Sequence, residues 1–127
     1  MELIFATNNK DKLNEVKNIL KDKYTVLGLS DIGFNDDIAE IEPTIKGNSE
    51  LKADFIYKKF NISCFADDTG LEIEALNGAP GVHSARYAGE DCIYEENLQK
   101  VLNEMKGKTN KKARFILITK IFILFMK

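Results

Sequence analysis

The 127-residue chain has few of the side chains from which zinc sites, redox motifs and catalytic triads are built, with one histidine and two cysteines. Cys64 and Cys92 stand in no CxxC or Cys/His spacing, which argues against a zinc site or a redox motif. His83 has no partner serine or cysteine motif, so it gives little support to triad chemistry. We therefore expect two ordinary thiols and a loop histidine.

An excess of charge of either sign is also lacking. The 18 lysines and arginines nearly balance the 20 acidic residues, and the net charge is -2. Because this balance gives no electrostatic reason for tight binding to nucleic acid or to an anionic membrane, we expect no DNA, RNA or membrane partner. Since no basic leader with a small-residue cleavage site follows Met1, we expect a cytoplasmic location. The apolar run from Phe115 to Met126 holds Lys120 and is shorter than the ~20 residues of a membrane-spanning helix.

Short apolar runs alternate with helical patterns along the chain. Helical spacing of Leu13, Val16, Ile19 and Leu20 follows the first strand-like run, and a second helix carries Leu51, Ala53, Phe55 and Ile56. This order predicts an α/β fold with a mixed central sheet flanked by helices. The predicted strands cover residues 3–7, 24–27, 64–66, 71–75 and 113–119, and the predicted helices begin near residues 10, 44 and 94.

Asp67 and Asp68 are the strongest local signal, because they follow the apolar run 64–66 directly. Adjacent carboxylates in a turn repel each other unless a cation or a hydrogen-bonding cluster neutralises them, and oxygen ligands without histidine or cysteine suit Mg²⁺. Glu40 or Glu42 could bring a third carboxylate from an acidic loop. The alternative is an Asp-Asp turn in which Gly70 supplies a positive φ.

The turn from Thr7 to Lys12 offers hydroxyl, amide and ammonium groups at the start of a helix, which suits a polyphosphate. It is not a P-loop, because the spacing GxxxxGK[ST] is absent. On these residues alone, a polar connection with Asn8 or Asn9 as the helix N-cap is the favoured interpretation. Lys52 lies on a predicted amphipathic helix, where lysine usually faces water. Arg86 could contact a phosphate or lie on the surface.

Four blocks of the chain together resemble the inosine triphosphate pyrophosphatase family, whose members act on non-standard purine nucleoside triphosphates. The blocks occur in the family's order and spacing. The resemblance implies an α/β fold with a long mixed sheet, a substrate cleft between two lobes, magnesium dependence and a homodimer. The blocks read FATNNKDK over residues 5–12, GNSELKA over 47–53, FADDTGLE over 65–72 and GAPGVHSARYAG over 78–89.

The resemblance implies hydrolysis of inosine, deoxyinosine and xanthosine triphosphates (ITP, dITP and XTP) to the monophosphate and pyrophosphate, which cleans the nucleotide pool. Glu40 and Asp68 would bind Mg²⁺, and Asp68 would also orient or deprotonate the attacking water. Asp67 would support this cluster, and Lys52 would add positive charge beside the phosphates. The residues that would bind the substrate are Thr7, Asn8, Asn9, Lys10, Asp11, Lys12, Thr69 and Arg86.

The sequence departs from the family after Phe115. The family's Phe-Gly-Tyr-Asp and Ser-His-Arg segments do not occur, and residues 116–127 form an aberrant apolar tail. We therefore expect residues 1–127 to be a single incomplete domain that lacks the C-terminal lobe, with poor solubility and weak selectivity for the base. The alternatives to a working enzyme are a truncated or frameshifted, non-catalytic fragment with weak nucleotide binding, and a partner-binding module anchored by the tail.

Overall fold

The structure, a computed structural model, describes residues 1–125. Strands and helices alternate along these residues, and β1 is parallel to β2 and β3 whereas β4 is antiparallel to β3. The predicted α/β class with a mixed sheet is therefore confirmed. The elements are β1 (Glu2–Phe5), α1 (Lys10–Leu20), β2 (Thr25–Leu27), η1 (Ser30–Ile32), α2 (Ile45–Phe60), β3 (Cys64–Ile73), η2 (Glu74–Leu76), β4 (Pro80–Gly81), η3 (Ser84–Arg86), α3 (Tyr94–Glu104) and β5 (Ala113–Phe122).

The chain forms two compact units. The first unit comprises Met1–Glu42, Lys46–Asp67 and the chain from Thr119 onward, and the second comprises Pro43–Ile45 and Asp68–Ile118. Strand β3 begins in the first unit and ends in the second. The single incomplete domain expected from the sequence stays a prediction.

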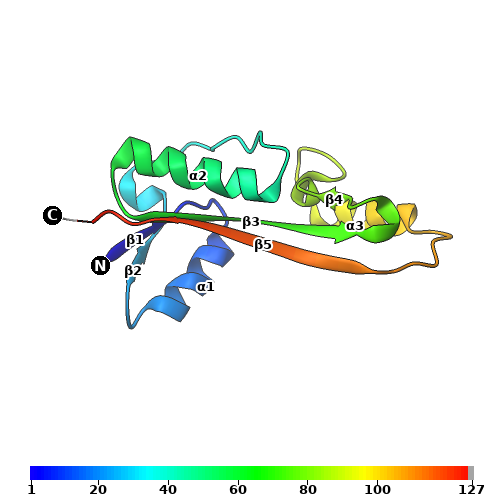
Figure 1. The fold of residues 1–127 in the computed structure, drawn as a ribbon, viewed down its shortest axis with the longest axis horizontal. Helices are drawn as coiled ribbons and strands as arrows, with labels where there is room; N and C mark the ends of the chain where they lie inside the picture. The colour runs from blue at the N-terminus through cyan, green and yellow to red at the C-terminus, as the bar shows by residue number, and fades with distance from the viewer. Residues whose placement is uncertain (126–127) are drawn as a thin grey trace. The chain divides into compact units, whose positions relative to one another are not determined.

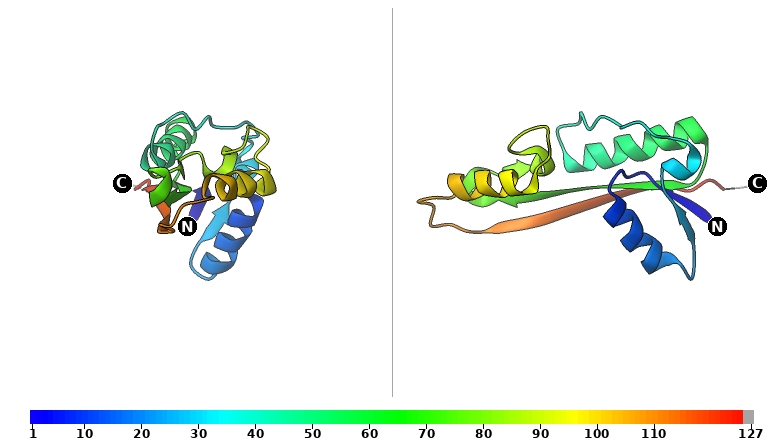
Figure 2. Two further views of the ribbon diagram at one scale, coloured as in Figure 1. Left: turned by 90° about the vertical axis from the view of Figure 1, so that its right-hand side faces the viewer. Right: turned by 180° about the vertical axis from the view of Figure 1, so that it is seen from behind.

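The first unit has two apolar layers because the side chains of its strands alternate between the two faces of the sheet. Leu3 and Phe5 of β1 lie in one buried cluster, against which α1 packs, whereas Ile4 lies in the other, to which α2 contributes Ala53 and Ile56. Helices α1 and α2 accordingly lie on opposite sides of β1 and the start of β3 (Figures 1 and 2). Burying each large side chain stabilises this arrangement by about 1.5–3 kcal/mol.

Helix α1 follows the predicted spacing with one exception. Leu13, Val16 and Leu20 pack against the sheet, but the side chain of Ile19 is 77% exposed. The interpretation of Ile19 as a packed residue is therefore wrong. Leu20, its neighbour, takes the position facing the sheet, and the 100° between successive helical residues turns Ile19 toward solvent.

Helix α2 buries two of the four apolar residues that the sequence predicted, together with two polar residues that it did not. Asn48, Ser49, Ala53 and Ile56 are all fully buried, whereas Phe55 is 42% exposed. Asn48 and Ser49 can be buried because their side chains are hydrogen-bonded, Asn48 to the backbone of Glu42 and Ser49 to the carbonyl oxygen of Lys46. A pattern of apolar residues alone misses Asn48 and Ser49.

The sequence predicted a strand that ends before Asp67. Strand β3 instead runs for ten residues, from Cys64 to Ile73, and includes both aspartates. The strand is paired on both sides of the aspartates, with β1 at Phe65 and with β4 at Leu71. Gly70 has no positive φ, so the predicted Asp-Asp turn is absent. A Cβ atom at Gly70 would clash with the backbone of Gly81 and would lie 2.6 Å from Cδ1 of Ile45. Close packing therefore leaves no room for a side chain at this position.

The second unit contains the end of β3, the short strand β4, helix α3 and most of β5. Strand β5 pairs with β3. The carbonyl oxygen of Lys112 accepts a hydrogen bond from the amide of Glu74, and Arg114 forms an ion pair with Glu72. From Lys112 to Arg114 the chain moves forward, whereas their partners move back from Glu74 to Glu72. Strands β3 and β5 are therefore antiparallel.

The predicted aberrant tail, residues 116–127, forms most of strand β5. Exposure alternates along β5, so that Ile116 and Ile118 are half-buried whereas Phe115, Leu117 and Ile121 are exposed. Met126 and Lys127 lie outside the described residues. The exposed apolar side chains are the physical basis for the expected poor solubility, which stays a prediction. Within residues 1–125, no helix has the length and apolar character needed to cross a membrane.

The two cysteines are both free, but their environments differ, since Cys64 is buried and Cys92 is exposed. Burial, and secondly the negative charge of Asp54, raises the pKa of the Cys64 thiol from 9.0 to about 11. At pH 8 we expect an aromatic disulfide reagent to modify only Cys92 quickly, and to reach Cys64 only after denaturation. Because the folded pKa is the higher one, this thiol's contribution to stability is complete below pH 9 and declines as the pH rises to about 11. Equal rates for both thiols, or a fast reaction in Cys92→Ser, would contradict the assignment.

Candidate active site

The connection between β1 and α1 is shaped by its own side chains. Asn9 caps α1, since its Oδ1 accepts a hydrogen bond of 3.0 Å from the amide of Lys12. Thr7 Oγ1 accepts from the amide of Asn9 at 3.1 Å, and Asn8 Nδ2 donates to Asp37 Oδ1 at 2.6 Å. The cap expected for a simple connection is therefore present, and the same bonds fix the turn that was predicted to hold a triphosphate.

The same turn borders a small cavity within the first unit. The cavity has a volume of about 160 Å³, and its lining is both polar and apolar: Thr7, Asn8, Lys10, Leu13, Leu29, Ser30, Phe34 and Asn35. Lys10 and Asp11 are both exposed in the first turn of α1. Asp11 suits this position because a carboxylate interacts favourably with the positive end of the helix dipole. Its negative charge makes it the least suitable of the six predicted residues for contacting a phosphate.

Lys12 connects α1 to β3. Its Nζ lies 2.8 Å from Oδ2 of Asp67, and the side chain of Asp67 is only 8% exposed. Asp67 continues the alternation of β3 beyond Phe65, which packs in the cluster against α1, so its carboxylate faces the helix that carries Lys12. The carboxylate of Asp67 is therefore paired with a lysine.

Lys52 approaches the same aspartate from α2. Its Nζ donates a hydrogen bond of 2.6 Å to the backbone oxygen of Asp67 and lies 3.6 Å from Oε2 of Glu40. The side chain of Lys52 is only 13% exposed. The expectation that a lysine on an amphipathic helix faces water is therefore wrong here, because a carbonyl and a carboxylate within reach replace the lost hydration.

Glu40 and Glu42 have different surroundings, although the sequence left both open as metal ligands. Glu40 lies beside Lys52, whereas Glu42 borders a separate groove of the first unit with Glu50 and Asp54. The backbone of Glu42 is held by the buried side chain of Asn48. This geometry favours Glu40 as the residue of the candidate site. Asn48 thus fixes the backbone two residues beyond Glu40.

Asp68 and Thr69 lie in the part of β3 that belongs to the second unit. Both are half-buried, and Oδ2 of Asp68 is buried.

Arg86 is half-buried at the end of the η3 turn, in the same unit as Asp68. The turn is fastened to β3 by Ser84, whose hydroxyl accepts a hydrogen bond from the amide of Leu71 at 2.9 Å and donates one to the carbonyl oxygen of Gly81 at 2.6 Å. The sequence analysis quoted Ser84 as part of a family block without giving it this role.

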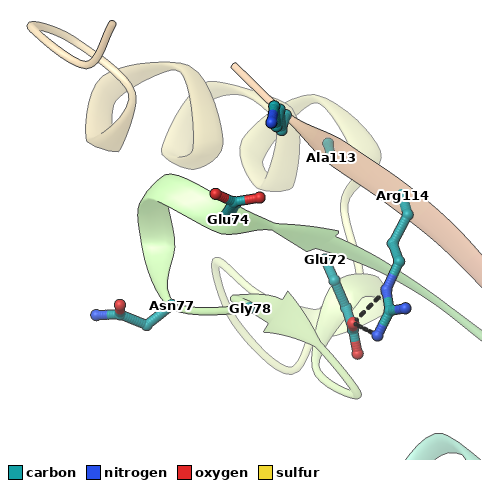
Figure 3. A pocket seen from close by; sticks show the side chains of 7 residues that line it. Glu72, Glu74, Asn77, Gly78, Ala113 and Arg114 are labelled. Atoms are coloured by element: carbon teal, nitrogen blue, oxygen red, sulfur yellow. Dashed lines mark hydrogen bonds and ion pairs between the residues drawn. The ribbon is translucent and has the colours of Figure 1, made fainter. Parts of the chain in front are cut away.

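A larger cavity, of about 420 Å³, lies in the second unit between the ends of β3 and β5 (Figure 3). Two of its carboxylates already have partners, because Arg114 Nη2 lies 2.8 Å from Glu72 Oε1 and Glu74 accepts a hydrogen bond from Asn110. Figure 3 shows Glu72 and Arg114 pointing toward one another rather than into open space. None of the predicted site residues borders this cavity, which we do not include in the site.

Within residues 1–125, no group of three or more histidine, cysteine, aspartate or glutamate side chains is placed to hold an ion. Mg²⁺ does not need such a group, because it is bound by one or two carboxylates and completes its shell with water and substrate phosphates.

Known proteins resemble this chain over most of its length. The model of the Ham1 family matches residues 3–124. A dITP/XTP pyrophosphatase of Flavobacterium psychrophilum is 51% identical over 115 residues, which are 91% of this chain and 60% of that protein. A dITP/XTP pyrophosphatase of Porphyromonas gingivalis is 54% identical over 106 residues, which are 84% of this chain and 55% of that protein.

Solved structures agree with these sequence matches. The Ham1 protein of Staphylococcus aureus superposes with a TM-score of 0.88 at 38% identity, covering 100% of this chain and 66% of that one. A HAM1 protein of Coxiella burnetii gives 0.85 at 33% identity, with 95% of this chain and 62% of that one covered. The chain spans about 60% of the length of the curated relatives that it matches. The family expected from the four sequence blocks is confirmed, and the chain belongs to the Ham1 family.

Proposed function

We propose that the chain hydrolyses non-standard purine nucleoside triphosphates (ITP, dITP and XTP) to the monophosphate and pyrophosphate, with Mg²⁺, and so cleans the nucleotide pool. One observation carries the proposal: Lys12 and Lys52, from two different helices, converge on Asp67 next to Asp68. The name dITP/XTP pyrophosphatase of the relatives gives the reaction class. A cytoplasmic location and a homodimer remain part of the proposal.

The charges of the cluster support a requirement for a further cation. Lys12 and Lys52 are matched by the carboxylates of Asp67 and Glu40, so the four side chains are together neutral. A bound triphosphate would bring several negative charges, and Lys10 is one exposed lysine beside the fixed turn that could offset them. The remaining charge calls for an ion such as Mg²⁺, which neutralises phosphate oxygens.

In this proposal, Glu40 and Asp68 hold Mg²⁺. When bound, the ion would polarise the phosphate oxygens and draw off negative charge. Asp68 would in addition orient the attacking water, or take its proton, for in-line attack at the α-phosphate. Thr69 and Arg86 would contact the substrate, and Asp67 would hold Lys12 and Lys52 in place. Hydrogen bonds to the 6-keto group of the base would distinguish hypoxanthine and xanthine from adenine.

The alternative function is a non-catalytic fragment that binds nucleotide weakly. Purified chain incubated with ITP and Mg²⁺ distinguishes the two. We expect release of pyrophosphate that stops when a chelator removes the metal. Release of orthophosphate instead, or no product from folded protein, would refute the proposed reaction.

Lys52→Gln is expected to weaken ITP binding by about 10–100-fold, because a hydrogen bond to a charged group is worth about 1.5–3 kcal/mol. Lys58→Gln is the matched control, since Lys58 lies on the same helix, is 74% exposed and pairs only with Asp54. Titration calorimetry with ITP gives both affinities. Equal losses in the two variants would show that general charge, rather than the position of Lys52, governs binding.

A further inference from the structure

The segment that carries Arg86 is held by three polar side chains of α3. Asn97, Lys100 and Glu104 are three and four positions apart, so they lie on one face of the helix. All three reach the segment 85–88, which follows β4. Figure 2 shows α3 beside this segment, and the helix and the segment belong to the same unit. The sequence predicted a helix from about residue 94, but not this polar face.

Asn97 makes the two most informative contacts. Its Nδ2 donates a hydrogen bond of 2.8 Å to the carbonyl oxygen of Ala85, and its Oδ1 accepts one of 2.7 Å from the amide of Ala88. The two backbone groups flank Arg86 and Tyr87 in the chain. Asn97 is half-buried, whereas every other residue of 91–100 is exposed. The side chain of Asn97 is therefore hydrogen-bonded to the backbone on both sides of Arg86 and Tyr87.

Lys100 and Glu104 hold the same segment at Tyr87. Lys100 Nζ donates to the carbonyl oxygen of Tyr87 at 2.9 Å and lies 4.2 Å from the centroid of its ring. The hydroxyl of Tyr87 donates to Glu104, and this bond, together with burial, raises the pKa of Tyr87 to about 12. Because the hydroxyl keeps its proton well above neutral pH, the contact persists under physiological conditions.

We propose that Asn97 is a positioning residue that fixes the segment 85–88 so that Arg86 is ready to contact the nucleotide. This inference rests on the role of Arg86 in the proposed function. A segment that is ordered before binding does not lose its conformational entropy when the ligand arrives, so its contacts contribute fully to affinity. Asn97 therefore acts on nucleotide affinity through Arg86, and it has little effect on the chemical step.

The test compares Asn97→Ala with Asn103→Ala. Asn103 lies on the same helix, and its side chain accepts a hydrogen bond from Gln99 instead of holding the segment. We expect Asn97→Ala to raise the Kd and the KM for ITP about tenfold, with kcat changed less than about twofold, as the loss of two neutral hydrogen bonds implies. Asn103→Ala should leave all three values unchanged. Asn97→Asp, which keeps the acceptor for Ala88, serves as a second variant in case Asn97→Ala does not fold.

Arg86→Ala provides the decisive comparison, because residues that act through one another are not additive. If Asn97 works through Arg86, adding Asn97→Ala or Asn97→Asp to Arg86→Ala will cause no further rise in Kd. Trypsin, which cleaves after arginine, should also cut at Arg86 faster in the Asn97 variants than in Asn103→Ala. This second readout reports the order of the segment without any nucleotide.

The outcomes separate the inference from the proposed function. A wild-type chain that binds ITP but releases no pyrophosphate would refute the proposed reaction, and the Kd series would still decide the role of Asn97. Unchanged affinity in Asn97→Ala, or an additive loss in the double variant, would overturn the inference while the reaction stands. A wild-type chain that does not bind ITP would overturn both.

Discussion

Asp68→Asn is expected to lower the release of pyrophosphate from ITP by about 10²–10⁴-fold, the range over which a positioned carboxylate contributes to proton transfer. The amide has nearly the same shape, but it cannot accept a proton and is a poor ligand for Mg²⁺. Since Oδ2 of Asp68 is buried, solvent cannot readily take over its role. A colorimetric pyrophosphate assay at saturating ITP measures the loss.

Asp54→Asn is the control for this experiment. Asp54 is also an aspartate, but it lies on α2 and its carboxylate pairs with Lys58, 3.0 Å away, at the helix surface. Its replacement should leave turnover within about twofold of the wild type, since surface ion pairs are worth about 0–1 kcal/mol. Asp68→Asn retaining more than a tenth of the wild-type rate, with native circular dichroism, would remove Asp68 from the catalytic role.

Ile56→Ala is expected to lower the free energy of unfolding by about 2–5 kcal/mol, which is a large part of the stability of a small domain. Ile56 is fully buried in the cluster between α2 and the sheet, together with Ile4 and Cys64. The truncation removes apolar contacts and leaves a cavity that a close-packed core fills only in part. Urea denaturation followed by circular dichroism measures the change.

Ile19→Ala makes the same chemical change on the surface of α1. Because Ile19 is 77% exposed, we expect its replacement to shift the free energy of unfolding by no more than about 0.5 kcal/mol. The pair thus tests the burial pattern directly. Similar losses for the two variants would mean that the face of α1 or of α2 is assigned wrongly.

Much of the fold could be predicted from local patterns. The run of β1 and the spacing of Leu13, Val16 and Leu20 determine a strand followed by a helix, because apolar side chains must share a face to be buried together. The Asn9 cap of α1 was likewise foreseeable from the residue type, since a short side-chain oxygen satisfies a free amide in the first turn. The four blocks also identified the family, which the matches over residues 3–124 confirm.

The structure alone decided which polar side chains meet. Lys12 and Asp67 are far apart in the sequence, and Lys52 reaches the carbonyl oxygen of Asp67 only because α1 and α2 pack on opposite faces of the sheet. No local pattern distinguishes a buried lysine from a solvated one, since both lie on an amphipathic helix. The polar face of α3 that binds the backbone of Ala85 and Ala88 was likewise not predicted, because no local pattern shows which polar side chains of a helix find a partner. Short-range sterics and the spacing of apolar residues can be read from the sequence, and they determine the helices and strands. The pairing of distant charges depends on how the packed helices and strands bring these charges together.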